Sequence, residues 1–461
     1  MRYIIFGTGK YCLKYVGNIN PAKILCFIDN DEAKKGKSFR GKVIYSTERL
    51  LQENYDYVIV LVKNYSVIVD QLIKMNIPEE KIITYSTLCH LESIPQRLIA
   101  INNEKCVCDW IDNKSGRKVF ICSHDFARTG VPVALMNLSI LLKKMGYHVL
   151  LAALGRGSLE KELVENEIDY ISDIEGQYLS SDFTEQLKRF DLIILGTLAI
   201  AEVGESFSRL GIPIMWWMHE SATEYFEKHR LPMNPGNLYY YGVGERVLKK
   251  FSEYYPEESI KELLYFLPDI PNVLHNYSEQ RSFALIGSFC ERKAQDILIA
   301  AIRELSDDVR EKCIFYFVGV STNDERKIIE SICKRYNQVH YIYELSQNEM
   351  TDFYLGIDVL ICPSRDDPMP IVVTQALQNG VPCIISNEVG QCKYLNQIGG
   401  GAVFPSEDIT ALKQEITKLV MCTTEELEQY AQSARRVFEL YFSEVLMRHN
   451  INKIIKELLL P

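Results

Sequence analysis

The amino-acid sequence predicts an α/β protein made of consecutive units with parallel sheets. An alternation of apolar, strand-like segments with helix-like segments starts three times, near residues 3, 118 and 283. At each start, a strand is followed by a loop and then by a helix, with glycine in the loop. The length of 461 residues agrees with this count, because domains average roughly 150 residues.

The composition excludes several classes of protein. A net charge of -10 is unlike that of a dedicated nucleic-acid binder. No apolar run reaches about 18 residues and the N-terminus has no cleavage signature, so we expect neither a membrane span nor a signal peptide. The 13 cysteines are scattered, often within apolar strands, which is typical of buried thiols in a reducing compartment.

The cysteines also give little indication of a metal site. Cys106 and Cys108 follow Cys89 and His90 in the sequence. Structural zinc sites usually have paired C-x-x-C ligands, and this spacing lacks them. We therefore expect no metal.

Residues 1–92 are predicted to form a small Rossmann-like domain. Gly7 and Gly9 follow the first strand and Asp29 comes about twenty residues later, as in a dinucleotide-binding fingerprint, but Cys12 replaces the third glycine. Two interpretations stay open. In the first, which we favour, the glycines form a tight turn that packs strand on helix and binds no ligand. In the second, the unit is a nucleotide-binding oxidoreductase module that holds a redox cofactor. The unit resembles the small Rossmann-like domains that precede sugar-modifying enzymes such as sugar-nucleotide acyltransferases.

The rest of the chain predicts two similar α/β domains that face each other. A polar run at residues 112–117 marks the end of a linker. Two amphipathic helices from residue 425 onwards are expected to pack their apolar face on the other domains. The predicted ranges are 93–117 for the linker, 118–278 and 279–440 for the two domains, and 441–461 for a last helix that packs back on the first of them.

Two loops carry the polar residues that could bind a ligand. Residues 364–370 follow a buried strand, include Asp366 and Asp367, and precede a helix, so they lie where open α/β sheets bind ligands. Arg292 and Lys293 lie in a loop before another helix and could bind a diphosphate. A cleft between two doubly wound domains commonly binds a substrate that contains a nucleotide.

From residue 118 to about 450 the chain resembles the retaining GT-B glycosyltransferases of the glycogen-synthase-like group. RTGVPVALMNLSILLKKMGYHV resembles their first glycine loop and helix, and WWMHES resembles the strand that brings a histidine to the cleft. IGSFCERKAQDILIAAI resembles the strand, basic loop and helix that bind the donor diphosphate. The stretch from SRDDPMPIVV to VGQ resembles the donor-sugar side of the site. These pieces run in the order of the family, which makes the resemblance specific.

The resemblance implies a role for each site residue. His219 and Asp367 would be catalytic, with His219 close to the donor sugar. The family has two glutamates eight positions apart, and Asp367 and Gln375 stand at these positions, so both depart from its pattern. Ser288 stands where many relatives have arginine. The donor-binding residues would be Gly130, Ser288, Arg292, Lys293, Met369, Pro370, Ile371, Gln375 and Gly390.

The function implied is metal-independent transfer of a hexose from a nucleotide-sugar, favoured as a UDP-sugar, to a hydroxyl of a surface polysaccharide, glycolipid or glycoprotein. No other cofactor is expected. The alternative is a non-catalytic binding or scaffold subunit of the same fold with an impaired donor site. The expected location is the cytoplasm. Peripheral contact with the inner membrane face, contact with other glycosyltransferases and assembly into a homo-oligomer are left open.

Overall fold

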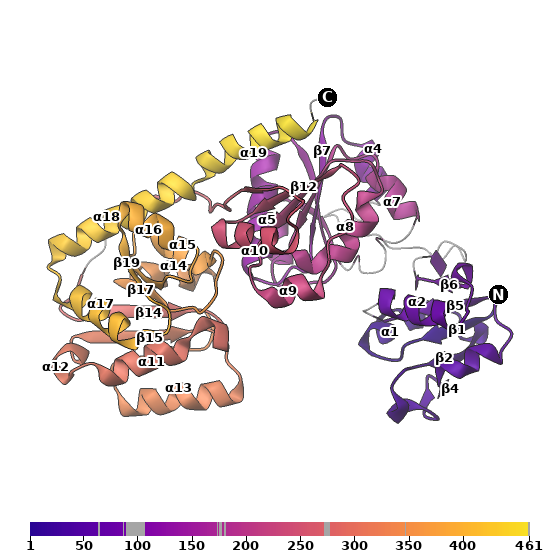
Figure 1. The fold of residues 1–461 in the computed structure, drawn as a ribbon, viewed down its shortest axis with the longest axis horizontal. Helices are drawn as coiled ribbons and strands as arrows, with labels where there is room; N and C mark the ends of the chain where they lie inside the picture. The colour runs from indigo at the N-terminus through magenta and orange to yellow at the C-terminus, as the bar shows by residue number, and fades with distance from the viewer. Residues whose placement is uncertain are drawn as a thin grey trace.

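The computed structural model describes residues 1–62, 65–85, 87–88, 107–172, 174, 178, 181–271, 277–345 and 347–459. The chain forms three α/β domains, each built on its own sheet (Figure 1). The predicted fold class is confirmed, because nearly all neighbouring strands in the three sheets are parallel. Among the described residues, no helix is both long and apolar enough to cross a membrane.

The N-terminal domain has a six-stranded sheet in the order β3-β4-β2-β1-β5-β6. All its pairs are parallel except β3 with β4. Between β4 and β5 the chain forms a short 3-10 segment, Thr47–Leu51. The elements are β1 Tyr3–Phe6, α1 Lys10–Tyr15, β2 Ile24–Ile28, β3 Ser38–Phe39, β4 Lys42–Tyr45, β5 Tyr57–Val60, α2 Tyr65–Lys74 and β6 Ile82–Ile83.

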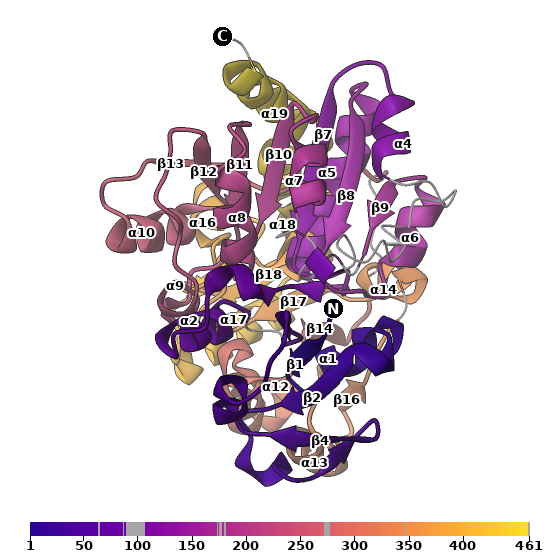
Figure 2. The ribbon, with the colours of Figure 1, turned by 90° about the vertical axis from the view of Figure 1, so that its right-hand side faces the viewer.

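The second domain has a seven-stranded parallel sheet in the order β13-β12-β11-β10-β7-β8-β9. Helices cover both faces, with α5 on one and α7 and α8 on the other (Figure 1 and Figure 2). The strands are β7 Lys118–Ser123, β8 His148–Ala153, β9 Asp169–Ile171, β10 Leu192–Gly196, β11 Ile214–Met218, β12 Leu238–Gly242 and β13 Ile260–Glu262. The helices are α4 Val107–Asp112, α5 Gly130–Lys144, α6 Glu160–Glu165, α7 Ser181–Leu187, α8 Ala201–Ser208, α9 Thr223–Lys228 and α10 Glu245–Tyr254.

Helix α4 occupies part of the stretch expected as a linker. Its Trp110 is buried, stacks on Phe190 with ring centroids 5.8 Å apart, and donates a hydrogen bond of 2.6 Å to Asp169 Oδ2. The packing of this indole against the second domain shows that α4 belongs to that domain. Residues 93–106 of the predicted linker lie outside the described part.

The third domain has a six-stranded parallel sheet in the order β16-β15-β14-β17-β18-β19. Its strands are β14 Arg281–Ile286, β15 Cys313–Val318, β16 Val339–Ile342, β17 Val359–Cys362, β18 Cys383–Ser386 and β19 Gly401–Phe404. Its helices are α11 Gln295–Glu304, α12 Asp307–Arg310, α13 Asn323–Arg335, α14 Gln347–Leu355, α15 Ile371–Gln378, α16 Cys392–Ile398 and α17 Ile409–Met421.

The last two helices, α18 Thr424–Tyr441 and α19 Glu444–Leu459, run from the third domain to the second (Figure 1). Helix α18 begins with a capping box in which Thr423 and Glu426 satisfy each other's backbone N–H groups. On α19, Ile451 and Ile455 are fully buried in the core shared with the second domain. Lys144 Nζ on α5 lies 3.0 Å from a Glu444 carboxylate oxygen. The chain therefore returns across both large domains before it ends.

Candidate active site

Polar side chains of the second and third domains meet where the parallel strands of both sheets end. Ser221, three residues after β11, donates a hydrogen bond of 2.8 Å to Asp366 Oδ1 in the loop after β17. Arg246 at the start of α10 lies 2.9 Å from the same Asp366 oxygen and 2.7 Å from Glu388 Oε2. Because the carboxyl ends of parallel strands are the ligand-binding edge of open α/β sheets, these contacts locate the candidate site between the two domains.

Asp367 is the centre of a charged cluster. Its side chain is only 9% exposed, and Oδ2 lies 2.5 Å from Lys293 Nζ and 3.1 Å from Arg292 Nη1. Arg292 Nη1 also donates to the backbone oxygen of Asp366 at 2.9 Å. The structure therefore brings together three residues that the sequence predicted for the site. With two cations and one carboxylate, the cluster is net positive by one charge and can accommodate a further anion.

Gly390 has a packing reason to be glycine. A Cβ atom there would lie 1.7 Å from the backbone oxygen of Pro368, so no side chain fits without moving the loop. The Gly390 N–H donates a hydrogen bond of 3.0 Å to the backbone oxygen of Asp367. The Asp367 N–H donates one of 3.1 Å to the backbone oxygen of Glu388. These bonds fix the loop after β17 against the loop after β18, and with it the position of the Asp367 carboxylate.

Helix α15 begins directly after the loop that contains Asp367. Pro370 is the N-cap residue of α15 and is buried, as is Met369, whereas Ile371 is half-buried. Gln375 lies one turn further along α15 and is half-buried, and its Oε1 accepts a hydrogen bond of 3.2 Å from the Tyr354 hydroxyl. The amide nitrogen of Gln375 can still donate to a ligand, since that bond uses only the oxygen.

His219 follows β11 directly and is half-buried. Burial, together with the nearby His124, lowers the pKa of His219 to about 3, so the imidazole is neutral at physiological pH. Its ring lies against Trp217 with centroids 4.7 Å apart. In the part of the chain that the structure describes, His219 Nε2 has no hydrogen-bond partner although it is shielded from solvent. A neutral ring nitrogen of this kind can bind a sugar hydroxyl.

Gly130 and Ser288 are both exposed to solvent. Gly130 is the first residue of α5, and no atom lies within 4 Å of the position of an added Cβ, so the space over this helix start is open. Ser288 is exposed, and its backbone oxygen accepts a hydrogen bond of 3.1 Å from Gln295 Nε2. The donor-binding roles expected for both residues stay predictions.

Sequence reasoning missed the residues that join the domains. It did not single out Ser221, Arg246 or Glu388, and it named Asp366 as a polar residue of the loop but not as a link between the domains. Their ion pairs and hydrogen bonds span 120 to 145 residues of sequence. The only local signal was the polar run His219, Glu220, Ser221 directly after a buried strand.

Most of the cysteine and histidine residues considered for a metal site are not described by the structure. Cys89, His90 and Cys106 lie outside the described residues. Among the residues that the structure does describe, no group of three or more His, Cys, Asp or Glu side chains could hold a metal ion.

Comparisons with known families agree with this geometry. Residues 268–437 match the family "Glycosyl transferases group 1", and residues 115–237 match "Glycosyl-transferase family 4". The two larger domains thus match glycosyltransferase family models and have the GT-B fold. Residues 1–83 match a third family, "C2185-like, N-terminal".

Individual relatives of this GT-B chain are distant. Lipopolysaccharide glucosyltransferase WaaG of Escherichia coli K12 is 23% identical over 190 residues, which are 39% of this chain and 50% of WaaG. The aligned region thus covers about half of this curated relative.

Solved structures show the same fold. Anabaena HepE in complex with UDP-glucose superposes with a TM-score of 0.62 and 14% identity, over 74% of this chain and 100% of HepE. A glycosyltransferase from Rickettsia africae gives a TM-score of 0.62 with 15% identity, over 75% of this chain and 100% of its own. At these identities the likeness establishes the GT-B fold alone.

Proposed function

We propose that this chain is a retaining glycosyltransferase that moves a hexose from a UDP-sugar to an acceptor hydroxyl. The observation that carries the proposal is the cluster of Arg292 and Lys293 on Asp367, in the region where the two GT-B domains meet. A nucleoside diphosphate is the leaving group of such a reaction. The two cations are suited to bind it, because charge-assisted hydrogen bonds to phosphate oxygens are among the strongest in proteins.

The cations would act most strongly as the bond to the sugar breaks. Negative charge then builds up on the diphosphate, and fixed cations stabilise that charge without reorganising. Lys293, only 17% exposed, is the better shielded of the two, whereas Arg292 is 45% exposed. Asp367 holds both in place before the donor arrives. This division of roles requires no metal ion.

His219 would orient the donor rather than take a proton from the acceptor. With a pKa of about 3, its imidazole is too weak a base to deprotonate a hydroxyl. Its unpartnered Nε2 can instead bind a hydroxyl of the donor sugar. The proton of the acceptor would then pass to an oxygen of the leaving phosphate on the same face of the sugar, with retention of configuration.

The substrate class rests on the relatives. HepE has been crystallised with UDP-glucose, and WaaG is a lipopolysaccharide glucosyltransferase. A UDP-hexose donor and a surface polysaccharide, glycolipid or glycoprotein acceptor follow by analogy. Such an acceptor would bring the enzyme to the inner face of the membrane as a peripheral protein.

The test is release of UDP from UDP-glucose and UDP-galactose, with and without extracts that contain candidate acceptors. Slow release by the wild type, reduced at least tenfold in Lys293→Ala, supports the proposal. A scaffold subunit would release no UDP under any condition. Gln375 favours that alternative, because an uncharged amide stands where the family has a glutamate. The variant Gln375→Glu should raise UDP release if the weaker ribose contact limits the enzyme.

A further inference from the structure

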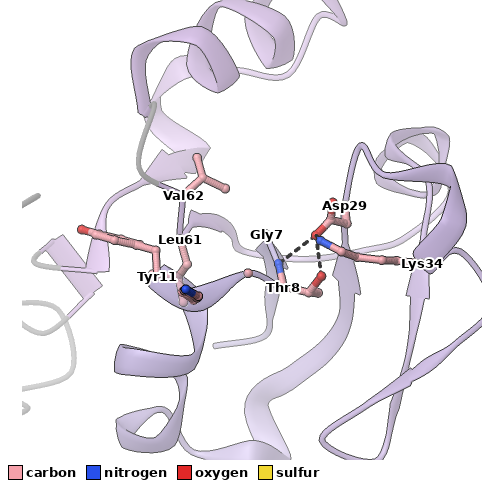
Figure 3. Close-up of a pocket in the computed structure, with 9 residues that line it drawn as sticks. Gly7, Thr8, Tyr11, Asp29, Lys34, Leu61 and Val62 are labelled. Carbon is pink, nitrogen blue, oxygen red and sulfur yellow. Dashed lines mark hydrogen bonds and ion pairs between the residues drawn. The ribbon is translucent and has the colours of Figure 1, made fainter. Parts of the chain in front are cut away.

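The N-terminal domain has a cavity of about 540 Å³ at the carboxyl ends of its central strands (Figure 3). This volume lies within the range of small-molecule sites. Its wall comprises the loop after β1 and the start of α1 (residues 7–11), Asp29 after β2, Lys34, and Leu61 and Val62 after β5.

The cavity lies where the strand order reverses. Strand β1 has β2 on one side and β5 on the other. The chain adds β2, β3 and β4 on the first side of β1 and then crosses over to add β5 and β6 on the second side. The crevice at such a reversal is the usual ligand site of an open parallel sheet. Nothing established for the glycosyltransferase domains involves this crevice, which belongs to a different sheet.

The two glycines of the loop have different roles. Gly7 has φ +104°, and a Cβ there would lie 2.6 Å from Val62 Cγ1, so Gly7 lets the loop pass close to the end of β5. Gly9 has an ordinary φ of -83°, and no atom lies within 4 Å of an added Cβ. Glycine at position 9 is therefore not needed for the turn, and the open space above it is available to a ligand.

Asp29 is held in a fixed orientation at one side of the cavity. Its Oδ2 accepts hydrogen bonds from the Thr8 N–H at 3.0 Å, from the Thr8 hydroxyl and from Lys34 Nζ at 3.0 Å. Burial acts to raise the pKa of Asp29, but the hydrogen bonds from Thr8, Asp31 and Lys34 outweigh it and lower the pKa. Its Oδ1 accepts from the Asp31 N–H at 3.0 Å and has capacity for a further donor.

The remaining wall offers a positive charge and apolar surface. Lys10 is exposed and makes no ion pair with any described residue. Together with Lys34 it makes the lining net positive by one charge against Asp29, which favours an anionic ligand. Leu61 and Val62 supply an apolar wall. The Thr8 N–H is already bonded to Asp29, so a diphosphate along this loop would lack that donor.

We propose that this cavity binds a ribonucleotide through a single phosphate. The ribose hydroxyls donate to Asp29 Oδ1, the phosphate pairs with Lys10, and the base lies against Leu61 and Val62. The chain then has a nucleotide site in its N-terminal domain that is independent of the sugar-donor site.

The experiment uses the full-length chain with Lys293→Ala, so that the sugar-donor site is weakened. Calorimetric titration with AMP, GMP, CMP and UMP should show one of them binding with a stoichiometry of one per chain. Lys10→Glu and Gly9→Leu should each weaken that binding at least tenfold. Lys37→Glu is the matched control, because it makes the same charge change at an exposed position of this domain outside the cavity, and it should leave binding unchanged.

The 2′-deoxy form of the bound nucleotide should bind at least about tenfold more weakly, because it lacks a hydrogen bond to a charged carboxylate. Thermal unfolding checks that Gly9→Leu folds, as its open surroundings lead us to expect. The proposal is overturned if none of the nucleotides binds at millimolar concentration. It is also overturned if binding persists in Lys10→Glu and Gly9→Leu, or if the deoxynucleotide binds equally well.

Discussion

Arg246 links the two GT-B domains, and its loss should loosen their arrangement. Its guanidinium lies 2.9 Å from Asp366 and 2.7 Å from Glu388, and all three side chains are about one third exposed. Arg246→Met removes both ion pairs but keeps the apolar stem. Partly exposed pairs contribute about 0.2–1 kcal/mol each, so the free energy that favours this arrangement should fall by about 1 kcal/mol. That corresponds to a shift of about fivefold in the equilibrium between closed and open domains.

Hydrogen–deuterium exchange measures this shift without an assumption about the substrate. Backbone amides in residues 364–371 and 219–222 should exchange several-fold faster in Arg246→Met. Lys250→Met is the matched control, because Lys250 lies on the same helix and pairs with Glu253 on that helix. High salt should speed exchange in the wild type and have little effect on Arg246→Met, because salt screens partly exposed pairs. Equal exchange in the two methionine variants would refute the reasoning.

Three further predictions concern the site itself. Lys293→Ala should lower the free energy of unfolding by about 1–3 kcal/mol in urea titrations, because the buried Asp367 carboxylate loses a hydrogen-bonded cation. Gly390→Ala should cost about 3 kcal/mol or more, because the added Cβ meets the Pro368 oxygen. His219 has a folded-state pKa of about 3, below its unfolded value of about 6.5, so the stability due to its burial as a neutral ring is complete above pH 6.5. That stability should decline below pH 6.5 by at most about 1.4 kcal/mol per pH unit, and His219→Gln should not show this decline.

Each of these has its own control. Adding Asp367→Asn to Lys293→Ala should cost less than the sum of the single changes, and strict additivity would contradict the pairing. Gly130→Ala places its methyl group in open space, so a cost as large as that of Gly390→Ala would show that the Cβ collision is not the cause. His449 is exposed on α19, and an equal pH effect in His449→Gln would contradict the assignment to His219.

The sequence was most informative where structure depends on local pattern. Apolar runs such as residues 358–362 predict buried strands, and the loop after this strand contains Asp367 as expected. The link from Arg246 to Asp366 could not be predicted, because it depends on how two folded domains are placed against each other. The same holds for Trp110, whose packing on Phe190 joins part of the expected linker to the second domain.

Gly390 shows how a family resemblance and a physical cause can differ. The resemblance assigned it to donor binding, whereas the structure gives a steric reason, the contact with the Pro368 oxygen. The steric reason and a role in donor binding are compatible, because the close contact of the two loops at Gly390 also fixes the position of Asp367. Local sequence could not supply the steric reason, because Pro368 lies on a different loop, 22 residues earlier.

Equilibrium binding of UDP-glucose tests the proposed donor site most directly, since it does not depend on knowing the acceptor. The measurement compares the wild type, Lys293→Ala and Lys10→Glu by calorimetric titration. If the cluster around Asp367 binds the donor diphosphate, Lys293→Ala should weaken binding at least tenfold and Lys10→Glu should leave it unchanged. Binding of equal strength in the wild type and Lys293→Ala would contradict the assignment of the donor site to this cluster.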